Sequence, residues 1–370
     1  MLSDSDMPKG IDTVPSPALL VDPSIVQSNL QRMLAVVQNQ PTRLRPHVKT
    51  HKMSTVVKRS VQAGIQKFKA ATTAELAMVA KAGGTDCLLA YQPVGPRQNE
   101  LLEIMKAFPK VRFSAVVDNT QTAEELNTLL VADKQELDVY IDVDCGMHRT
   151  GIPWGSGLEQ LQHSLAELPA LHYQGLHVYD GHLHQSALAE RTDAAELILE
   201  EIQKALQRYP DSKVIAGGSP TFEFWAQQAN QSPVEGRWEC SPGTMVFWDR
   251  GYGSNYQDMD YGIAAVLLTR VISHPGERLI CVDLGHKAVA SEMALERRVY
   301  FPQLSAATFV GQSEEHLVLE TDQAASLPVG TPLIALPTHI CPTVALHRQA
   351  YLVEDGKVTG ETWTVDARDR

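Results

Sequence analysis

The feature that most constrains this chain is a regular alternation of β-rich runs and helical patterns from Leu44 to about Thr244. Such alternation is typical of parallel βαβ units, because successive parallel strands need a crossover connection that is usually a helix. The β-rich runs span residues 44–49, 68–72, 87–91, 112–117, 138–144, 172–179, 213–216 and 237–241. Eight such units predict an α/β fold, namely a (β/α)8 TIM barrel.

The connecting segments predict the helices that surround such a barrel. Residues 188–209 carry Ala and Leu at helical spacing, with charged residues on the opposite face. Residues 74–83 predict another helix, which ends at Gly83 because glycine takes the left-handed cap conformation. Asp22 and Pro23 predict the N-cap and first turn of a helix that precedes the first strand.

The pattern changes beyond Tyr261 to β-like runs with little helical periodicity, at residues 264–272, 278–284, 316–320 and 332–336. Turns that contain Pro and Gly separate these runs. We therefore predict two domains, a barrel over residues 15–254 and a C-terminal β domain over residues 255–370. The N-terminal residues 1–21, with a strand-like run at 18–21, are a candidate to add a strand to the β domain.

The composition indicates an enzyme with a small-molecule substrate. The chain has 370 residues, of which 44% are hydrophobic and 21% charged, enough for a sizeable core. The net charge of −12 and the lack of a basic stretch argue against nucleic acid and anionic membranes as partners.

The cysteines and the N-terminus predict a cytoplasmic protein. The five cysteines are scattered and odd in number, so we expect no disulfide framework and a reducing compartment. Residues 1–6 are polar and acidic, unlike a signal peptide, and we expect no export. The longest apolar stretch, residues 263–268, is too short to cross a bilayer.

The candidate site residues all follow predicted strands. In a TIM barrel the active site lies at the C-terminal ends of the strands, so residues there share one face. This rule selects Lys49, Thr72, Arg149, Tyr179, the turn Gly217-Gly218-Ser219 and the pair Gly243-Thr244.

Lys49 is the candidate nucleophile. A lysine nucleophile has to lose its proton, and a barrel mouth with partial burial and neighbouring cations favours the neutral amine. His47, His51 and Lys52 supply such a setting. A solvated surface lysine is the alternative for an arbitrary lysine, and Lys52 is the competing nucleophile three residues on.

The other candidates each allow two interpretations. The turn Gly217-Gly218-Ser219 offers backbone N–H groups and a hydroxyl to a phosphate, or is merely a tight turn. Arg149 faces a phenolate or a pyridine nitrogen, or forms a surface salt bridge. Tyr179 stacks, donates a hydrogen bond or simply packs.

His339 and Cys341, one residue apart, are the candidate metal ligands. Imidazole and thiolate suit zinc better than magnesium or calcium, which prefer oxygen. Two protein ligands leave positions open for water and substrate, which indicates catalysis. The alternative is a buried thiol beside a hydrogen-bonded core histidine.

Four motifs together resemble the D-threonine aldolase / D-serine dehydratase family, which belongs to the alanine-racemase-like, fold type III enzymes that use pyridoxal 5′-phosphate (PLP). The motifs are Ser16-Pro17-Ala18-Leu19-Leu20-Val21-Asp22, Arg45-Pro46-His47-Val48-Lys49-Thr50-His51-Lys52, Asp142-Val143-Asp144-Cys145-Gly146-Met147-His148-Arg149-Thr150-Gly151 and Pro337-Thr338-His339-Ile340-Cys341-Pro342-Thr343. They run in order along nearly the whole chain.

The resemblance implies a cofactor imine on Lys49 and a phosphate at Gly217, Gly218 and Ser219. It places Arg149 and Tyr179 near the pyridine ring and a divalent metal, zinc or manganese, on His339 and Cys341, and we predict that Thr72, which the strand-end rule selects, belongs to the cofactor site as well. It also implies a homodimer and a D-3-hydroxy amino acid as substrate.

The resemblance also bears on the reaction. Aldolases of the family tend to carry His-x-Asp at the metal and dehydratases His-x-Cys, so the cysteine here favours a dehydratase that forms keto acid and ammonia. Retro-aldol cleavage to glycine and an aldehyde stays open. A racemase needs a second base and has no use for the metal pair, and a non-catalytic PLP-binding protein of the single-barrel kind lacks the second domain.

Overall fold

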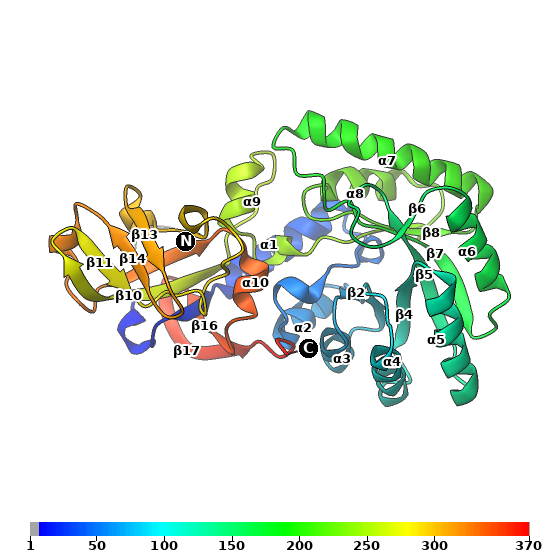
Figure 1. Cartoon of the computed structure of the whole chain (residues 1–370), viewed down its shortest axis with the longest axis horizontal. Helices are drawn as coiled ribbons and strands as arrows, with labels where there is room; N and C mark the ends of the chain where they lie inside the picture. Colours follow the sequence, from blue (N-terminus) through cyan, green and yellow to red (C-terminus); the bar gives the residue numbers. More distant parts are fainter. Residues whose placement is uncertain (1–6, 370) are drawn as a thin grey trace. The chain divides into compact units, whose positions relative to one another are not determined.

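The computed structural model describes residues 7–369, which form two compact units (Figure 1). One unit consists of residues 32–49 and 56–243, and the other contains residues up to 31, 50–55 and 244–369. Residues 1–6, for which we predict no export signal, and Arg370 lie outside the described residues. The predicted domain limits, 15–254 and 255–370, stay a prediction.

The first unit is built on a parallel sheet with the order β2-β3-β4-β5-β7-β8-β9, and β6 pairs with β5. The strands are β2 (Lys67–Ala70), β3 (Asp86–Leu89), β4 (Arg112–Val117), β5 (Leu137–Asp144), β6 (Ile152–Pro153), β7 (Leu171–Val178), β8 (Lys213–Ala216) and β9 (Trp238–Cys240).

Residues 44–47 fill the eighth position of this sheet. Leu44 bridges to Cys240 on β9, and His47 bridges to Lys69 on β2, both in parallel. The curled sheet thereby closes between its two edge strands. The prediction of a TIM barrel is confirmed, although its first strand is reduced to isolated bridges.

Helices lie on the outer side of the curled sheet, as Figure 1 shows for α4 to α7. The predicted helices at 74–83 and 188–209 are confirmed as α3 and α7, and the helix after Asp22 as α1, whose Ser24 N–H donates to the Asp22 carboxylate at 2.8 Å. The bounds are α1 (Pro23–Val36), α2 (Ser54–Gln62), α3 (Thr73–Lys81), α4 (Pro96–Ala107), α5 (Thr120–Asp133), α6 (Ser156–Ala166), α7 (Leu188–Arg208) and α8 (Phe222–Gln231), with 3-10 turns η2 (Pro41–Arg43) and η3 (Val48–Thr50).

The barrel interior carries charge where TIM barrels ordinarily hold branched apolar side chains. Near the N-terminal ends of the strands, Arg45 donates to Glu239 at 2.5 Å and to Asp86 at 2.6 Å. Lys67 donates to the other oxygen of Glu239, also at 2.5 Å. We call these four residues the lower layer.

The second unit is built on a sheet with the order β13-β14-β11-β10-β1-β16-β17, and β15 pairs with both β10 and β12. The strands are β1 (Ala18–Val21), β10 (Ala265–Gly276), β11 (Leu279–Val282), β12 (Val299–Tyr300), β13 (Thr308–Gln312), β14 (Leu317–Glu320), β15 (Pro332–Pro337), β16 (Gln349–Glu354) and β17 (Lys357–Thr364). Strands β10, β11, β14 and β15 match the predicted runs, whereas β12, β13, β16 and β17 were not predicted.

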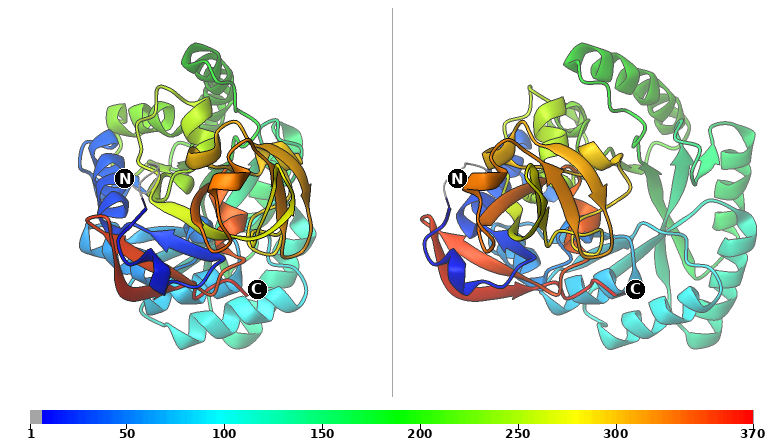
Figure 2. Two further views of the ribbon diagram at one scale, coloured as in Figure 1. Left: turned by 90° about the vertical axis from the view of Figure 1, so that its left-hand side faces the viewer. Right: turned by 60° about the vertical axis from the view of Figure 1, so that its left-hand side comes forward.

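The N-terminal strand β1 is a central strand of this sheet. It pairs antiparallel with β10 and parallel with β16, and Figure 2 shows the blue strand beside the red ones. All four of its residues are buried, as expected for a strand covered on both faces. Leu20 packs against Val266 and Ile334 in the core of the sheet.

Short helical elements complete the second unit: α9 (Arg250–Asn255), α10 (Ile340–Val344), η1 (Ile11–Thr13), η4 (Thr244–Val246), η5 (Leu295–Arg297), η6 (Pro302–Leu304) and η7 (Ala324–Ser326). Across residues 7–369, no helix combines the length and the apolar character that a membrane span requires.

Candidate active site

Lys49 lies in the turn η3, directly after the segment that closes the barrel. The side chain is half-buried, and the backbone N–H of Lys49 donates to Nδ1 of His47 at 3.3 Å. This bond gives His47 a local structural role beside the lysine. The Nζ atom of Lys49 lies 5.8 Å from the centroid of the Tyr179 ring.

The ring of Tyr179 is the point where three cationic groups meet. Nζ of Lys69 lies 5.6 Å and Cζ of Arg149 5.0 Å from its centroid, in addition to Lys49. These distances are within the range of cation–π attraction. The structure thus brings together Lys49, Arg149 and Tyr179, three of the residues that the sequence predicted.

Two glycines hold the Tyr179 ring in place. A Cβ atom on Gly181 would lie 2.3 Å from Cε1 of Tyr179, and one on Gly218 would lie 3.2 Å from Cε2. Any larger residue at Gly181 would displace the ring, so the orientation of Tyr179 depends on that glycine.

The loop that carries Arg149 is tied to the ends of two strands. The Thr150 hydroxyl donates to Asp142 at 3.0 Å, and the N–H of Gly151 donates to Asp118 at 3.1 Å. Gly151 has φ +99°, and a Cβ there would lie 2.5 Å from the backbone nitrogen of Asp144. These bonds fix the exposed Arg149 close to the barrel mouth.

Three buried residues beneath Tyr179 were not singled out from the sequence: Lys69, His177 and Asp142. Nζ of Lys69 lies 3.5 Å from Nε2 of His177, and Nδ1 of His177 lies 2.7 Å from Asp142, which also accepts from Gln92 at 2.7 Å. We call these three residues the upper layer. Charged and polar residues inside runs that otherwise read as barrel strands were the signal that could have identified them.

Burial, nearby charges and hydrogen bonds together determine the pKa values of the three residues in the upper layer. Burial and the nearby charge of Lys49 lower the pKa of Lys69 to about 7, against the partial opposition of Asp142 and Asp180. Burial also lowers the pKa of His177, although Asp142 opposes it. The pKa of Asp142 is lowered because hydrogen bonds from His177, Thr150 and Gln92 outweigh its burial.

The turn Gly217-Gly218-Ser219 has internal partners. The N–H of Gly217 donates to the Val178 carbonyl and that of Gly218 to Asp180, both at 2.9 Å. Gly217 has φ +78°, and a Cβ there would lie 2.3 Å from Trp225. Packing against Trp225 therefore requires a glycine at 217. A phosphate bound here would have to replace Asp180 as the acceptor of the hydrogen bond from the Gly218 N–H.

Thr72 has a structural role that is separate from its predicted contact with the cofactor. Its hydroxyl caps α3 by accepting from the Glu75 N–H at 3.1 Å. Thr72 lines one cavity with Tyr91 and Arg97, whereas Arg149 and Tyr179 line another. Thr72 thus lines a different cavity from Arg149 and Tyr179.

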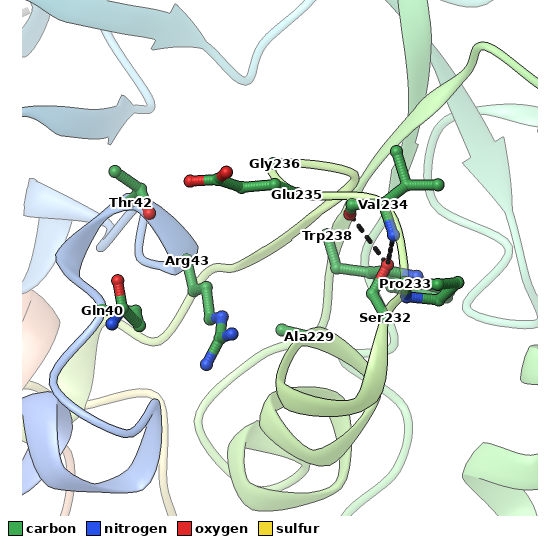
Figure 3. Close-up of a pocket in the computed structure, with 10 residues that line it drawn as sticks. All are labelled: Gln40, Thr42, Arg43, Ala229, Ser232, Pro233, Val234, Glu235, Gly236 and Trp238. Carbon is green, nitrogen blue, oxygen red and sulfur yellow. Dashed lines mark hydrogen bonds between the residues drawn. The ribbon is translucent and has the colours of Figure 1, made fainter.

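A further cavity, of about 320 Å³, lies near the N-terminal end of β9 (Figure 3). Arg43 and Trp238 line it, and hydrogen bonds between Ser232 and Val234 close its loop. The Arg43 guanidinium already donates to Asn230 at 2.8 Å. Active sites of TIM barrels lie at the opposite ends of the strands, so this cavity is not part of the candidate site.

The barrel mouth fits PLP by its charge and its aromatic ring. Three basic side chains surround one ring, where the charge of Lys49 disfavours a second positive charge on Lys69, and Asp142 and Asp180 are the carboxylates that oppose this effect. An anionic, planar cofactor would relieve this repulsion, and Lys49 supplies the amine for an imine. The donor set thus suits the cofactor that the sequence predicted.

His339 and Cys341 lie next to each other in the second unit. Burial alone would lower the pKa of His339, but the hydrogen bond and charge of Cys341, together with Glu292, raise it to about 9. Nδ1 of His339 lies 2.7 Å from a carboxylate oxygen of Glu292. Sγ of Cys341 lies 3.1 Å from the Thr50 hydroxyl and 3.5 Å from that of Thr244.

The donors of this cluster fit a metal with open coordination positions. A carboxylate accepts hydrogen bonds only, so when His339 binds a metal as the neutral imidazole, Glu292 fixes the remaining proton on Nδ1 and leaves Nε2 as the ligand. Imidazole nitrogen and thiolate sulfur suit zinc. Among residues 7–369, no group of three or more His, Cys, Asp or Glu side chains is placed to hold a metal, so a metal here would have two protein ligands.

Comparisons with known proteins agree with these features. Residues 21–250 match the family model described as alanine racemase, N-terminal domain, and residues 264–353 match a putative serine dehydratase domain. The chain is 26% identical over 364 residues to a D-threonine aldolase of an Arthrobacter species, covering 96% of this chain and 93% of the relative. It is 27% identical over 384 residues to a D-threo-3-hydroxyaspartate dehydratase of a Delftia species, covering 95% and 97%.

The fold has a close counterpart among solved structures. The crystal structure of D-threonine aldolase from Filomicrobium marinum superposes with a TM-score of 0.86 at 24% identity, covering 99% of this chain and 98% of that one. The first family model alone spans more than half of the chain. The chain therefore belongs to the alanine racemase family through its N-terminal domain, and within it to the D-threonine aldolase / D-serine dehydratase family of PLP-dependent lyases.

Proposed function

We propose that this protein is a metal-assisted, PLP-dependent dehydratase that converts a D-3-hydroxy amino acid into a keto acid and ammonia. The nearly equal identities to an aldolase and to a dehydratase favour neither reaction, so the choice depends on the residues. Cys341 favours dehydration, because the dehydratases of the family tend to carry cysteine at this position and the aldolases aspartate.

The observation that carries the proposal is the contact of Thr50 with Cys341 at 3.1 Å. Thr50 follows Lys49 in the sequence, so the peptide bond joins the proposed imine lysine to a residue of the proposed metal cluster. Consecutive α-carbons are about 3.8 Å apart. This connectivity supports the participation of both motifs in one reaction.

The bound cofactor would supply an electron sink for the bond broken at the substrate's α-carbon. Lys49 Nζ would remove the α-proton once the substrate has displaced it. Arg149 and Tyr179 would orient the planar ring, and Gly217, Gly218 and Ser219 would bind the phosphate. Thr72 remains the least supported of the proposed cofactor contacts because its hydroxyl caps α3.

His339 and Cys341 would hold zinc or manganese, which supplies a Lewis acid for the 3-hydroxyl group. The hydroxyl groups of Thr50 and Thr244 would stabilise the thiolate of Cys341 through hydrogen bonds. Retro-aldol cleavage to glycine and an aldehyde is the second candidate, and the similarity to an Arthrobacter D-threonine aldolase over 96% of the chain keeps it open.

We further propose a cytoplasmic homodimer. All five cysteines are free thiols, which suits a reducing compartment. The dimer is carried over from the family.

The products formed from D-serine, D-threonine and D-3-hydroxyaspartate test the proposal. We expect keto acid and ammonia, in amounts that fall on exhaustive chelation and recover with added zinc or manganese. The visible absorbance of the internal imine should survive chelation, because Lys49 and not the metal holds the cofactor. Glycine and aldehyde as the main products would favour the aldolase, and full activity of Cys341→Ala after chelation would refute the metal site.

A further inference from the structure

Two lysines on strand β2 face the barrel interior in different surroundings. Lys67 donates to Glu239 at 2.5 Å in the lower layer. Lys69, two residues on and 2% exposed, is buried in the upper layer, where its amine contacts a histidine and an aromatic ring. A buried ammonium without a carboxylate at bonding distance loses more solvation energy than it regains.

The hydrogen bonds of His177 determine how Lys69 is held. The pKa of Asp142 is lowered, so its carboxylate is ionised and accepts the hydrogen on Nδ1 of His177 at 2.7 Å. Nε2 of neutral His177 then carries a lone pair and accepts from Nζ of Lys69 at 3.5 Å. One N–H of Lys69 thus points at His177, whether the amine is neutral or protonated.

Charged and titratable groups face Lys69 from each neighbouring element. They are Arg45 and Lys49 from the segment that closes the barrel, Asp142 from β5, His177 from β7, and Tyr179 and Asp180 from the loop after β7. Burial dominates, and it lowers the pKa of Lys69 to about 7. Near neutral pH, a large fraction of Lys69 is therefore a free amine.

Lys49 needs such a neighbour in the proposed reaction. After taking the α-proton from the substrate, Lys49 is an ammonium ion and has no lone pair with which to recapture the cofactor. Its Nζ and that of Lys69 lie 5.8 Å and 5.6 Å from the same ring centroid, and the charge of Lys49 acts on Lys69.

We propose that the neutral amine of Lys69, held by His177 and Asp142, accepts from Nζ of Lys49 the proton that Lys49 has removed from the substrate. The N–H bond on Lys49 breaks and leaves its electron pair on that nitrogen, while a new N–H bond forms on Nζ of Lys69. The ammonium of Lys69 keeps its hydrogen bond to Nε2 of His177 and later releases the proton to solvent. The inference rests on the proposed function, in which Lys49 is the base.

A titration of the cofactor-free protein tests the state of Lys69 directly. With 13Cε-labelled lysine, the NMR signal that disappears in Lys69→Arg should titrate with a midpoint near pH 7. Lys49→Met removes a nearby positive charge and should raise that midpoint, whereas Asp142→Asn removes a negative one and should lower it. A midpoint in the ordinary lysine range, about 10.4, would overturn the inference.

The pH dependence of the holoenzyme tests the proton transfer. Because Lys69 has to be neutral, the rate of the wild type should fall below pH 7, and Asp142→Asn should shift this fall to lower pH. Lys69→Arg cannot accept a proton and should lower the rate by about 10² to 10⁴ and abolish the fall. Lys69→Met should behave like Lys69→Arg, and Lys67→Arg is the matched control on the same strand.

Two outcomes separate this inference from the proposed function. If borohydride fixes no pyridoxyl group on Lys49 of the wild type, the proposed function itself is wrong. If Lys49 is labelled and Lys69→Arg keeps the wild-type rate and pH profile, only the role of Lys69 is wrong. Should both Lys69 variants fail to fold, the opposite midpoint shifts in Lys49→Met and Asp142→Asn identify the Lys69 signal of the wild type, and its midpoint still decides the state of the amine.

Discussion

The two polar layers inside the barrel each contain one lysine of β2. The lysine of the lower layer pairs with a carboxylate, and the lysine of the upper layer pairs with a histidine. In the lower layer, Arg45 and Lys67 each donate at 2.5 Å to Glu239, and Asp86 neutralises the remaining charge. In the upper layer, the amine of Lys69 faces a histidine at 3.5 Å. The lower layer therefore stabilises ionised groups, whereas the upper layer stabilises a neutral amine.

The difference teaches that position along one strand decides the role of a lysine that faces the barrel interior. Lys67 and Lys69 share β2 and face the same interior. Strong pairing makes Lys67 structural, because breaking a buried pair leaves an uncompensated charge. Weak pairing leaves Lys69 able to exchange protons near neutral pH, at the end of the barrel where chemistry takes place.

The largest expected effect is that of Lys49→Ala, at the mouth above the upper layer. It removes both the imine and the base, and we expect the rate to fall by about 10² to 10⁴ or more. Borohydride treatment followed by peptide mapping should place the pyridoxyl group on Lys49 of the wild type. Lys52→Ala is the control, and a label on Lys52 would contradict the assignment.

Glu239→Ala should break the lower layer. It leaves the buried Arg45 without its partner, and we expect about 3–5 kcal/mol less free energy of unfolding. Urea unfolding followed by circular dichroism measures this loss. Glu314→Ala, at the exposed ion pair with Lys287, should leave the midpoint nearly unchanged. If Glu239→Ala were as stable as the wild type, the ion pairs of the lower layer would not have the structural role that distinguishes them from the upper layer.

Glu292→Gln tests a carboxylate that orients a ligand, in contrast to Glu239, which neutralises charge. Because Glu292 holds Nδ1 of His339 at 2.7 Å, we expect metal affinity to fall by about 10- to 100-fold. Competition with a chelator measures this affinity without reference to activity. Glu296→Gln is a matched exposed control, and equal affinities of both variants would make the Glu292–His339 pair a surface contact only.

Lys69→Met should change how stability depends on pH. The pKa of Lys69 is lowered in the folded state, so the unfolded chain binds more protons and wild-type stability rises from about pH 7 to the unfolded pKa near 10.4. Lys69→Met lacks this rise, and its advantage over the wild type should be greatest near pH 7, on the order of a few kcal/mol. Parallel stability curves from pH 7 to 9.5 would contradict the low pKa.

Thr72→Ala should have the smallest effect. Loss of the cap on α3 should cost about 1 kcal/mol of unfolding free energy, and Thr72→Ser should keep the cap. Equilibrium dialysis of PLP then separates the two roles of this residue. Reduced cofactor affinity in a variant of unchanged stability would favour the predicted cofactor contact over the cap.

The sequence predicts the barrel and the gathering of Lys49, Arg149 and Tyr179, because strand order and the strand-end rule are enough for both. The sequence does not predict the upper layer, because the contact between Asp142 and His177 depends on the register of β5 against β7. Asp142 and His177 are neighbours because β5 and β7 pair with these two residues side by side. No local pattern specifies this register, and the same holds for Glu292 and His339, which lie 47 residues apart.

The central place of β1 has a consequence for the order of folding. Residues 18–21 are synthesised long before their parallel neighbour β16, which spans residues 349–354. During synthesis the barrel unit can fold as its own residues emerge, while β1 keeps an unpaired edge until β16 has been synthesised. Deletion of β1 or of β16 should therefore damage the same sheet, and a nascent chain stalled before β16 would leave one edge of the apolar strand β1 unpaired and prone to aggregation.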